Sequence, residues 1–279
     1  MSRDIIPPVL VPYIRRDGTG ESSLSLVTST LTNPPHWLLL RHLYAGLTSS
    51  PPNATSSTNT VVLVSLLQSR DCWLELCKKT GVDLVSLTKS KQLVYIDGVD
   101  LDSNPSEISK SIFPVIKFTS LDLDDLLRII TTTISSITHT KSHTTLIIDG
   151  IDFLLALQPD TITTAQQTLS TLFHLATHTI VTLHADGPFL HNHSSTISTP
   201  LEKAQASLLT TLAHQATYVF QLRGLSTGAA KGITGVLRVT RGGGFDDDSE
   251  EGGSAEGVDG EWLYQWKGDG GVHLWVRGE

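Results

Sequence analysis

Short apolar runs alternate with amphipathic segments over most of the chain. The run at residues 61–67 is apolar on both faces and rich in β-branched side chains, which is typical of a buried strand in a parallel sheet. The segment from Leu123 to Ile137 carries apolar residues at helical spacing. The pattern predicts strands at residues 24–29, 61–67, 93–96, 145–148 and 180–184, and helices at 36–47, 71–80, 123–137, 163–178 and 199–216.

Residues with capping chemistry mark several of these helix ends. Pro35 suits the first position of the helix that follows it. Asp71 is expected to cap the next helix, and Gly81 to end it. Thr199 and Glu202 have the spacing of a capping box at the start of the helix over residues 199–216.

The pattern changes after residue 216, where strands follow one another without helices. Strands are predicted at residues 218–222, 235–240, 261–266 and 272–276, and Asp269-Gly270 is a hairpin turn signal between the last two. Strand–helix alternation followed by a strand meander predicts an α/β fold. We expect a mainly parallel sheet flanked by helices, with antiparallel strands added at the C-terminal edge, which is the outline of a RecA-like domain.

We expect this single RecA-like domain to span residues 1–279. Within it, residues 1–22 are interpreted as an extended N-terminal segment. Residues 242–260 are acidic and rich in glycine, with few apolar side chains to offset the entropy of ordering. They are interpreted as a disordered insertion between two strands, which is either a solvated loop without a role or an acidic segment that attracts a basic partner.

The composition of the chain indicates which kinds of partner it can bind and which cellular compartment it suits. The net charge of −8 over 279 residues disfavours a free-standing nucleic-acid binder. Cys72 and Cys77 lie five positions apart on one predicted helix and point in different directions, so they suit a reducing compartment. The expected localisation is cytoplasmic, with the nucleus as a second site. We expect no secretory leader, because the start of the chain has prolines and lacks an apolar run.

The turn after the first strand lacks the chemistry of a phosphate-binding loop. In RecA-like nucleotidases this turn offers glycine N–H groups and a lysine to phosphates, and a Ser/Thr to magnesium. Here it reads Thr-Leu-Thr-Asn33-Pro34-Pro35, without glycine or lysine, and the two prolines have no N–H to donate. Asp149, at the end of the fourth predicted strand, resembles a magnesium-positioning aspartate. Without phosphates to complete a metal site, we interpret Asp149 as structural.

No other set of residues indicates catalysis, a metal or a cofactor. His184, His191 and His193 are too sparse for a zinc site and are interpreted as part of a solvated loop. No Gly-X-Ser-X-Gly elbow occurs, so a hydrolase nucleophile is unsupported. We expect no catalytic residue, no metal and no cofactor.

Two stretches of the chain resemble the sixth subunit of the Elongator complex. The first is residues 61–84, with Ser-Leu-Leu after the apolar strand, Trp73 in the helix, and Gly-Val-Asp-Leu at its end. The second is the C-terminal region, with Arg-Gly-Gly-Gly at residues 241–244, then Trp262, Tyr264 and Lys-Gly-Asp-Gly-Gly-Val at residues 267–272. The fifth subunit of the same complex is the nearest alternative.

The resemblance implies a non-catalytic, RecA-like subunit of a hetero-hexameric ring shared with the fourth and fifth Elongator subunits. That ring attaches to the catalytic Elongator subcomplex, which modifies the wobble uridine of tRNA, and the chain would bind tRNA weakly and collectively. In RecA-like rings the loops after the fourth and fifth core strands face the pore, here residues 157–163 and 186–198. His191, His193 and the nearby Lys203 are therefore candidate nucleic-acid contacts. A recombination accessory protein and an atypical NTPase remain alternative functions.

Overall fold

A single ten-stranded sheet forms the centre of the computed structural model, which describes residues 5–15, 22–48, 59–100, 114–137, 143–158, 161–187, 199–245 and 259–276. The strand order across the sheet is β10-β9-β8-β7-β1-β6-β5-β2-β3-β4. The strands are β1 (Ser23–Ser29), β2 (Thr60–Ser65), β3 (Leu93–Asp97), β4 (Ile116–Lys117), β5 (Thr144–Asp149), β6 (His178–His184), β7 (Tyr218–Arg223), β8 (Gly235–Arg241), β9 (Gly260–Trp266) and β10 (Val272–Trp275).

The sheet is parallel from β7 to β4 and antiparallel from β7 to β10. Strand β1 lies between β6 and β7, and it pairs with β6 along its whole length. Helical crossovers join the parallel strands, whereas short connections suffice for the antiparallel ones. The predicted fold class, including antiparallel strands at the C-terminal edge, is confirmed.

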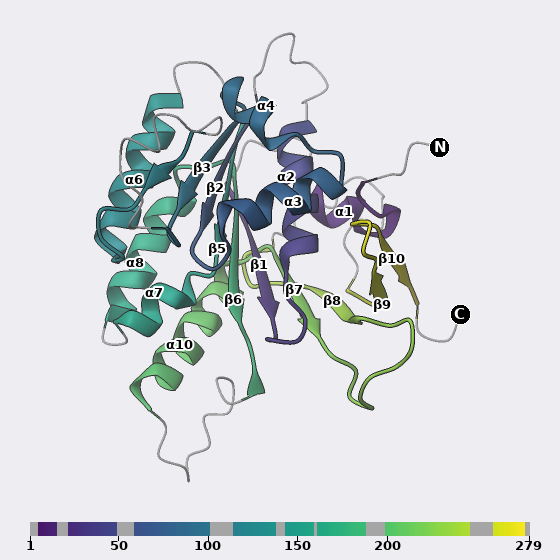
Figure 1. Cartoon of the computed structure of the whole chain (residues 1–279). Helices are drawn as coiled ribbons and strands as arrows, with labels where there is room; N and C mark the ends of the chain where they lie inside the picture. Colours follow the sequence, from purple (N-terminus) through teal and green to yellow (C-terminus); the bar gives the residue numbers. More distant parts are fainter. Residues whose placement is uncertain are drawn as a thin grey trace, which may run out of the picture.

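Helices cover both faces of the sheet (Figure 1). Helices α2 (His36–Thr48), α3 (Arg70–Lys79) and α4 (Leu84–Lys89) pack on one face, and α6 (Leu123–Ile137), α7 (Asp152–Leu157), α8 (Ile162–Phe173) and α10 (Pro200–Gln215) on the other. The side chains of successive strand residues point to opposite faces of the sheet. Leu63 therefore packs in the hydrophobic core on one face, and Val64 in the core on the other. No helix among the described residues is long and apolar enough to cross a membrane.

Local sequence explains most helix ends, with one correction. Thr199 and Glu202 form the predicted capping box of α10. The cap of α3 is Ser69 rather than Asp71, because the Ser69 hydroxyl accepts the Cys72 N–H; the cap therefore lies two residues earlier than predicted. Asp71 lies in the first turn, where its charge complements the helix dipole.

Three short helices were not predicted. Helices α4 and α7 each have six residues, too few to show a periodic apolar stripe. Within residues 1–22, a 3-10 turn (Pro8–Leu10) and helix α1 (Val11–Ile14) replace extended chain. Helix α8 ends at Phe173, earlier than predicted, because β6 already begins at His178.

The glycine run 242–244 is ordered and closes the end of α10. Its three N–H groups donate to the carbonyls of Thr217, Ala213 and Ala216. A Cβ at Gly242 would lie 2.1 Å from the Ala216 carbonyl oxygen, so side chains are excluded there. These glycines were expected to be part of the disordered insertion, but they are part of the domain. Residues 246–258 of that insertion lie outside the described residues.

The C-terminal hairpin β9–β10 reaches back to helix α2. The Arg41 guanidinium donates to the Gly270 carbonyl at 2.8 Å, at the hairpin turn. Trp37 packs on Tyr264 with ring centroids 5.1 Å apart. The last strands are thereby fixed beside the first helix that follows β1, close to the turn where a RecA-like domain binds nucleotide.

Candidate functional site

The candidate site lies where the central parallel strands end. In open α/β sheets, ligands bind at the carboxyl ends of the strands. Three predicted positions meet at this edge: the turn after β1, Asp149 at the end of β5, and His184 at the end of β6. The structure therefore brings together the positions that would hold nucleotide phosphates and magnesium in a RecA-like enzyme.

The turn after β1 is too tight to surround a phosphate. The Asn33 N–H donates to the Thr30 carbonyl at 2.9 Å, which closes a four-residue turn. Pro34 follows, and the Pro35 carbonyl accepts the N–H groups of Leu38 and Leu39 at the start of α2. A phosphate loop needs several convergent, unused N–H groups, and this turn has used or lost most of them.

Asp186 takes up a further N–H of the same turn. Its carboxylate accepts the Leu31 N–H at 3.2 Å from the segment after β6. A carboxylate here occupies the side of the turn from which an anion would approach, and it would repel a phosphate. Leu31 itself is 82% exposed. Sequence reasoning missed Asp186, because its partner lies on another strand and no local spacing signals the contact.

Asn33 fills the site with a hydrogen-bonded side chain. Its amide donates to the Thr234 carbonyl at 2.9 Å and to the Tyr264 hydroxyl at 3.0 Å, and its oxygen accepts from the hydroxyls of Thr30 and Thr32. Asn33 is 1% exposed. The residue that replaces part of the phosphate loop therefore holds the C-terminal strands against the central sheet.

Asp149 is fully buried, and only one of its two carboxyl oxygens has a hydrogen-bond partner among the described residues. One carboxyl oxygen accepts from the Thr182 hydroxyl at 3.1 Å, and that hydroxyl accepts the Gly150 N–H. The other oxygen has no hydrogen-bond partner. Burial raises the pKa of Asp149 to about 7, which favours the neutral carboxylic acid. Protonation of the carboxyl would compete with binding of a magnesium ion at this position.

His184 and Asp152 form an ion pair at the same edge. The two side chains are 2.7 Å apart, and this hydrogen bond raises the pKa of His184. Burial lowers the pKa of the neighbouring His36 to about 4. Among the described residues, no group of three His, Cys, Asp or Glu side chains could hold a metal ion.

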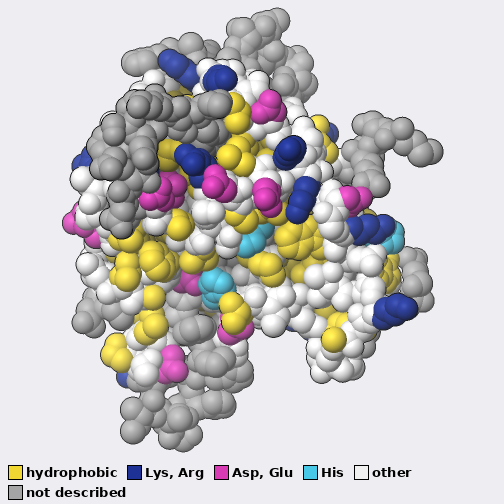
Figure 2. Space-filling model, viewed as in Figure 1, with side chains coloured by type: hydrophobic (Ala, Val, Ile, Leu, Met, Phe, Trp, Pro, Cys, Tyr) yellow, Lys and Arg dark blue, Asp and Glu magenta, His cyan; other side chains and the backbone are white. Residues whose placement is uncertain are grey.

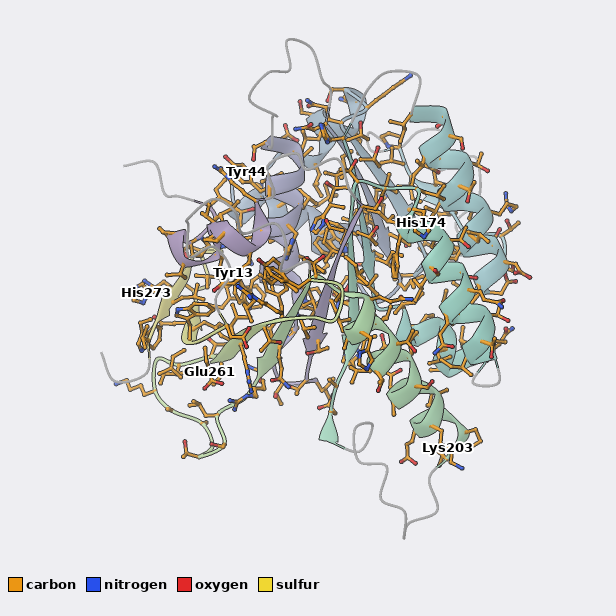
Figure 3. The ribbon with its side chains drawn as sticks, turned by 180° about the vertical axis from the view of Figure 1, so that it is seen from behind. Tyr13, Tyr44, His174, Lys203, Glu261 and His273 are labelled. Atoms are coloured by element: carbon orange, nitrogen blue, oxygen red, sulfur yellow. The ribbon has the colours of Figure 1, made fainter. Side chains whose placement is uncertain are left out.

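The candidate nucleic-acid contacts are only partly visible. His191 and His193 lie outside the described residues. Lys203 is exposed in the first turns of α10, at the lower end of that helix in Figure 3. In the other candidate loop, residues 157–163, Leu157 ends α7 and Ile162 begins α8, and residues 159–160 lie outside the described residues.

The fold and the site define the class of protein: a RecA-like domain whose phosphate-binding turn has been replaced by a structural contact. The family model for Elongation complex protein 6 matches residues 55–255. The chain belongs to this family, as the resemblance to the sixth Elongator subunit predicted. The match includes the β2–α3 stretch that carried the resemblance and the 241–244 glycine run.

A crystal structure of a KaiC-like protein from the hyperthermophilic archaeon Pyrococcus horikoshii OT3 has a similar fold. The TM-score is 0.52 over 92% of this chain and 90% of that one, at 14% sequence identity. At that identity the likeness concerns the fold alone. No curated protein sequence matches the chain significantly.

The Asn33 contact can be measured with a double-mutant cycle. Asn33→Ala leaves the Thr234 carbonyl and the Tyr264 hydroxyl without their donor, so it should lower the free energy of unfolding by about 2–3 kcal/mol. Tyr264→Phe should cost less, and the double variant less than the sum of the two. Urea unfolding provides the measurement. Tyr44→Phe, a half-buried tyrosine on α2, is the control and should cost little; strict additivity would contradict the contact.

Asp149 should make stability depend on pH. Its pKa is about 7 in the folded state and 3.8 as the ordinary value, so the folded protein binds the extra proton between these values. The contribution of Asp149 to the free energy of unfolding therefore falls as pH rises from about 4 to about 7. Asp149→Asn, which mimics the neutral acid, should exceed wild type in stability by up to about 4 kcal/mol above pH 7, and differ little at pH 4.

Urea unfolding of wild type and Asp149→Asn at several pH values tests this directly. The informative quantity is the difference in stability between the two proteins, which cancels the titration of groups that do not interact with Asp149. Asp124→Asn, an exposed change on α6, serves as control and should give a small difference with no step at pH 7. A pH-independent difference for Asp149→Asn would show that the carboxyl group is ionised throughout.

Proposed function

We propose that this chain is a non-catalytic subunit of the Elongator complex, in a hetero-hexameric ring with the fourth and fifth subunits. The observation that carries the proposal is membership of the Elongation complex protein 6 family together with a phosphate turn that is filled by Asn33 and Asp186. The ring would attach to the catalytic subcomplex and assist modification of the tRNA wobble uridine, in the cytoplasm and also in the nucleus.

A scaffolding role follows from what the site has lost. The N–H groups of Leu31 and Asn33 are engaged within the chain, and Asp149 favours its neutral form. Neither phosphates nor magnesium have the ligands that they need here. A RecA-like domain of this kind retains its sheet and helix faces for packing against similar domains, while the chemistry belongs to other subunits.

Binding of tRNA would be collective. Each phosphate that a protein neutralises releases counterions, and a chain with a net charge of −8 can neutralise few. We propose His191, His193 and Lys203 as weak contacts near the pore, where partly protonated histidines add to the surfaces of neighbouring subunits. The acidic insertion within residues 242–260 is proposed to be dispensable for folding, since loop entropy changes slowly with length.

The isolated chain should not hydrolyse ATP. Pro34 and Pro35 lie in the turn after β1, where a phosphate loop would be, and Asp186 accepts the N–H of Leu31 in that turn. The turn therefore lacks the N–H donors that would stabilise the transition state of γ-phosphate transfer. Phosphate release by the purified chain with Mg²⁺ and ATP should equal that of the Asp149→Ala variant. A higher rate that this variant abolishes would establish the NTPase alternative instead.

The ring should bind tRNA far better than the chain alone. We expect the purified chain to assemble with the fourth and fifth subunits into a hexamer, measured by native mass spectrometry. Filter binding should then show weak or no tRNA binding by the chain alone and clear binding by the assembly. The double variant His191→Ala/His193→Ala should assemble normally and bind tRNA several-fold more weakly at most. If the lone chain binds tRNA as tightly as the ring, collective binding is wrong.

A further inference from the structure

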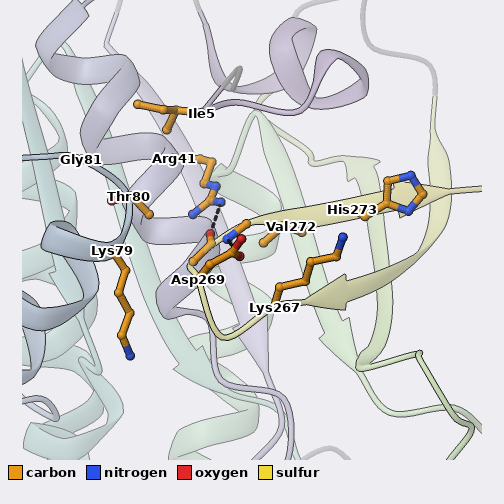
Figure 4. A pocket seen from close by; sticks show the side chains of 11 residues that line it. Ile5, Arg41, Lys79, Thr80, Gly81, Lys267, Asp269, Val272 and His273 are labelled. Atoms are coloured by element: carbon orange, nitrogen blue, oxygen red, sulfur yellow. Dashed lines mark hydrogen bonds between the residues drawn. The ribbon is translucent and has the colours of Figure 1, made fainter. Parts of the chain in front are cut away.

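A cavity of about 490 Å³ lies away from the nucleotide-like edge, between the end of α3 and the β9–β10 hairpin (Figure 4). Its volume falls in the range of small-molecule sites, which runs from about 300 to 1,000 Å³. Lys79, Thr80 and Gly81 form one wall, the hairpin from Lys267 to His273 forms the other, and Arg41 of α2 lies at the back. Ile5 and Val272 add apolar surface.

Arg41 is a buried cation without an acidic partner among the described residues. It is 3% exposed, and its guanidinium donates only to the carbonyls of Trp37 and Gly270 among the described residues, with Nε unpaired. Burial lowers its pKa to about 10, so the group is still charged at neutral pH. The Trp37 ring, 6.0 Å from the guanidinium carbon, offsets little of that charge. Buried charges are normally paired, so an uncompensated one favours an anion in the cavity beside it.

Two lysines extend this positive charge to the mouth of the cavity. Lys79 and Lys267 are exposed, and neither forms an ion pair with a described residue. In Figure 2, Lys and Arg side chains lie over α3 and the hairpin on the right of the view. Asp and Glu side chains lie among them on the same face, so the positive excess is confined to the lining of the cavity.

Two groups at the cavity oppose an anion, and both are already engaged. Asp269 accepts the Gly271 N–H within the hairpin turn, and it is the one acid among the lining residues. The carbonyls at the end of α3 carry partial negative charge, but those of Cys77 and Lys78 accept the N–H groups that follow the helix. Arg41, Lys79 and Lys267 therefore exceed the opposing charge.

We propose that this cavity binds a small phosphate monoester, with the phosphate beside Arg41 and an organic body against Ile5 and Val272. The side chains of Lys79 and Lys267 extend in different directions in Figure 4, and both would turn towards the phosphate on binding. A monoester carries close to two negative charges at neutral pH, which matches three cations facing one acid. Carboxylates and the phosphodiesters of a nucleic-acid backbone carry one charge and fit less well. This site is separate from the turn after β1, and the proposal does not depend on the ring.

Calorimetry with the full chain and three simple probes tests the proposal. Phenyl phosphate should bind about tenfold more tightly than dimethyl phosphate or benzoate at pH 7.5, because charge-assisted hydrogen bonds to lysine scale with anionic charge. Below pH 6, where the monoester loses a charge, its affinity should fall towards that of the diester. Equal binding of the three probes would overturn the monoester site, and tighter binding of the diester would indicate a nucleic-acid surface instead.

Paired variants separate a specific site from general charge. The double variant Lys79→Ala/Lys267→Ala should weaken the binding of phenyl phosphate by about tenfold or more. Lys89→Ala/Lys231→Ala makes the same change of charge at exposed residues that do not line the cavity, and should leave the affinity unchanged. Equal losses in the two variants, or no binding of phenyl phosphate by wild type, would refute the site.

Discussion

The hydrogen bonds of Asn33 hold the C-terminal antiparallel strands against the central parallel sheet. A side chain in the turn after the central strand β1 donates to the Thr234 carbonyl before β8 and to the Tyr264 hydroxyl on β9. The contact with Tyr264 is buried and the contact with Thr234 partly buried, so losing the first would leave the Tyr264 hydroxyl without this partner in a buried setting. Trp37 on Tyr264 and Arg41 on Gly270 continue the same junction along α2. The antiparallel edge of the sheet is thereby tied to its parallel centre.

This junction occupies the place where a RecA-like enzyme handles phosphate. A phosphate loop must keep its N–H groups unused and its interior open, whereas a structural turn must satisfy them. In this chain Asn33, Thr30 and Asp186 satisfy the turn from within. The contacts that stabilise this edge of the sheet therefore use the same backbone groups that nucleotide binding would require.

The charged groups at the strand edge differ from those that line the cavity beside Arg41. At the strand edge, Asp186 and Asp152 disfavour anions, and the buried Asp149 favours its neutral form. Near the C-terminal hairpin, Arg41 and two lysines surround a cavity with positive charge. A net charge of −8 conceals this contrast, because composition sums over surfaces that are separated in space.

The sequence by itself determined the element order, the mainly parallel sheet with its antiparallel edge, and the loss of the phosphate loop. These follow from local chemistry: apolar runs, capping residues such as Thr199, and the missing N–H groups of Pro34 and Pro35. Helices α4 and α7 escaped prediction because six residues carry too little periodicity. The ordered glycines 242–244 looked like linker, since the α10 carbonyls that they cap lie elsewhere in the sequence.

Only the tertiary structure decided what replaced the lost chemistry. The partners of Asn33 and Leu31 lie on β9 and after β6, and the charged walls around Arg41 come from three separate segments. Contacts between residues far apart in sequence depend on strand order and packing, which a single sequence does not encode in any local spacing. The missing glycine and lysine of the turn could therefore be read from six residues, whereas the contacts that the turn makes required the fold.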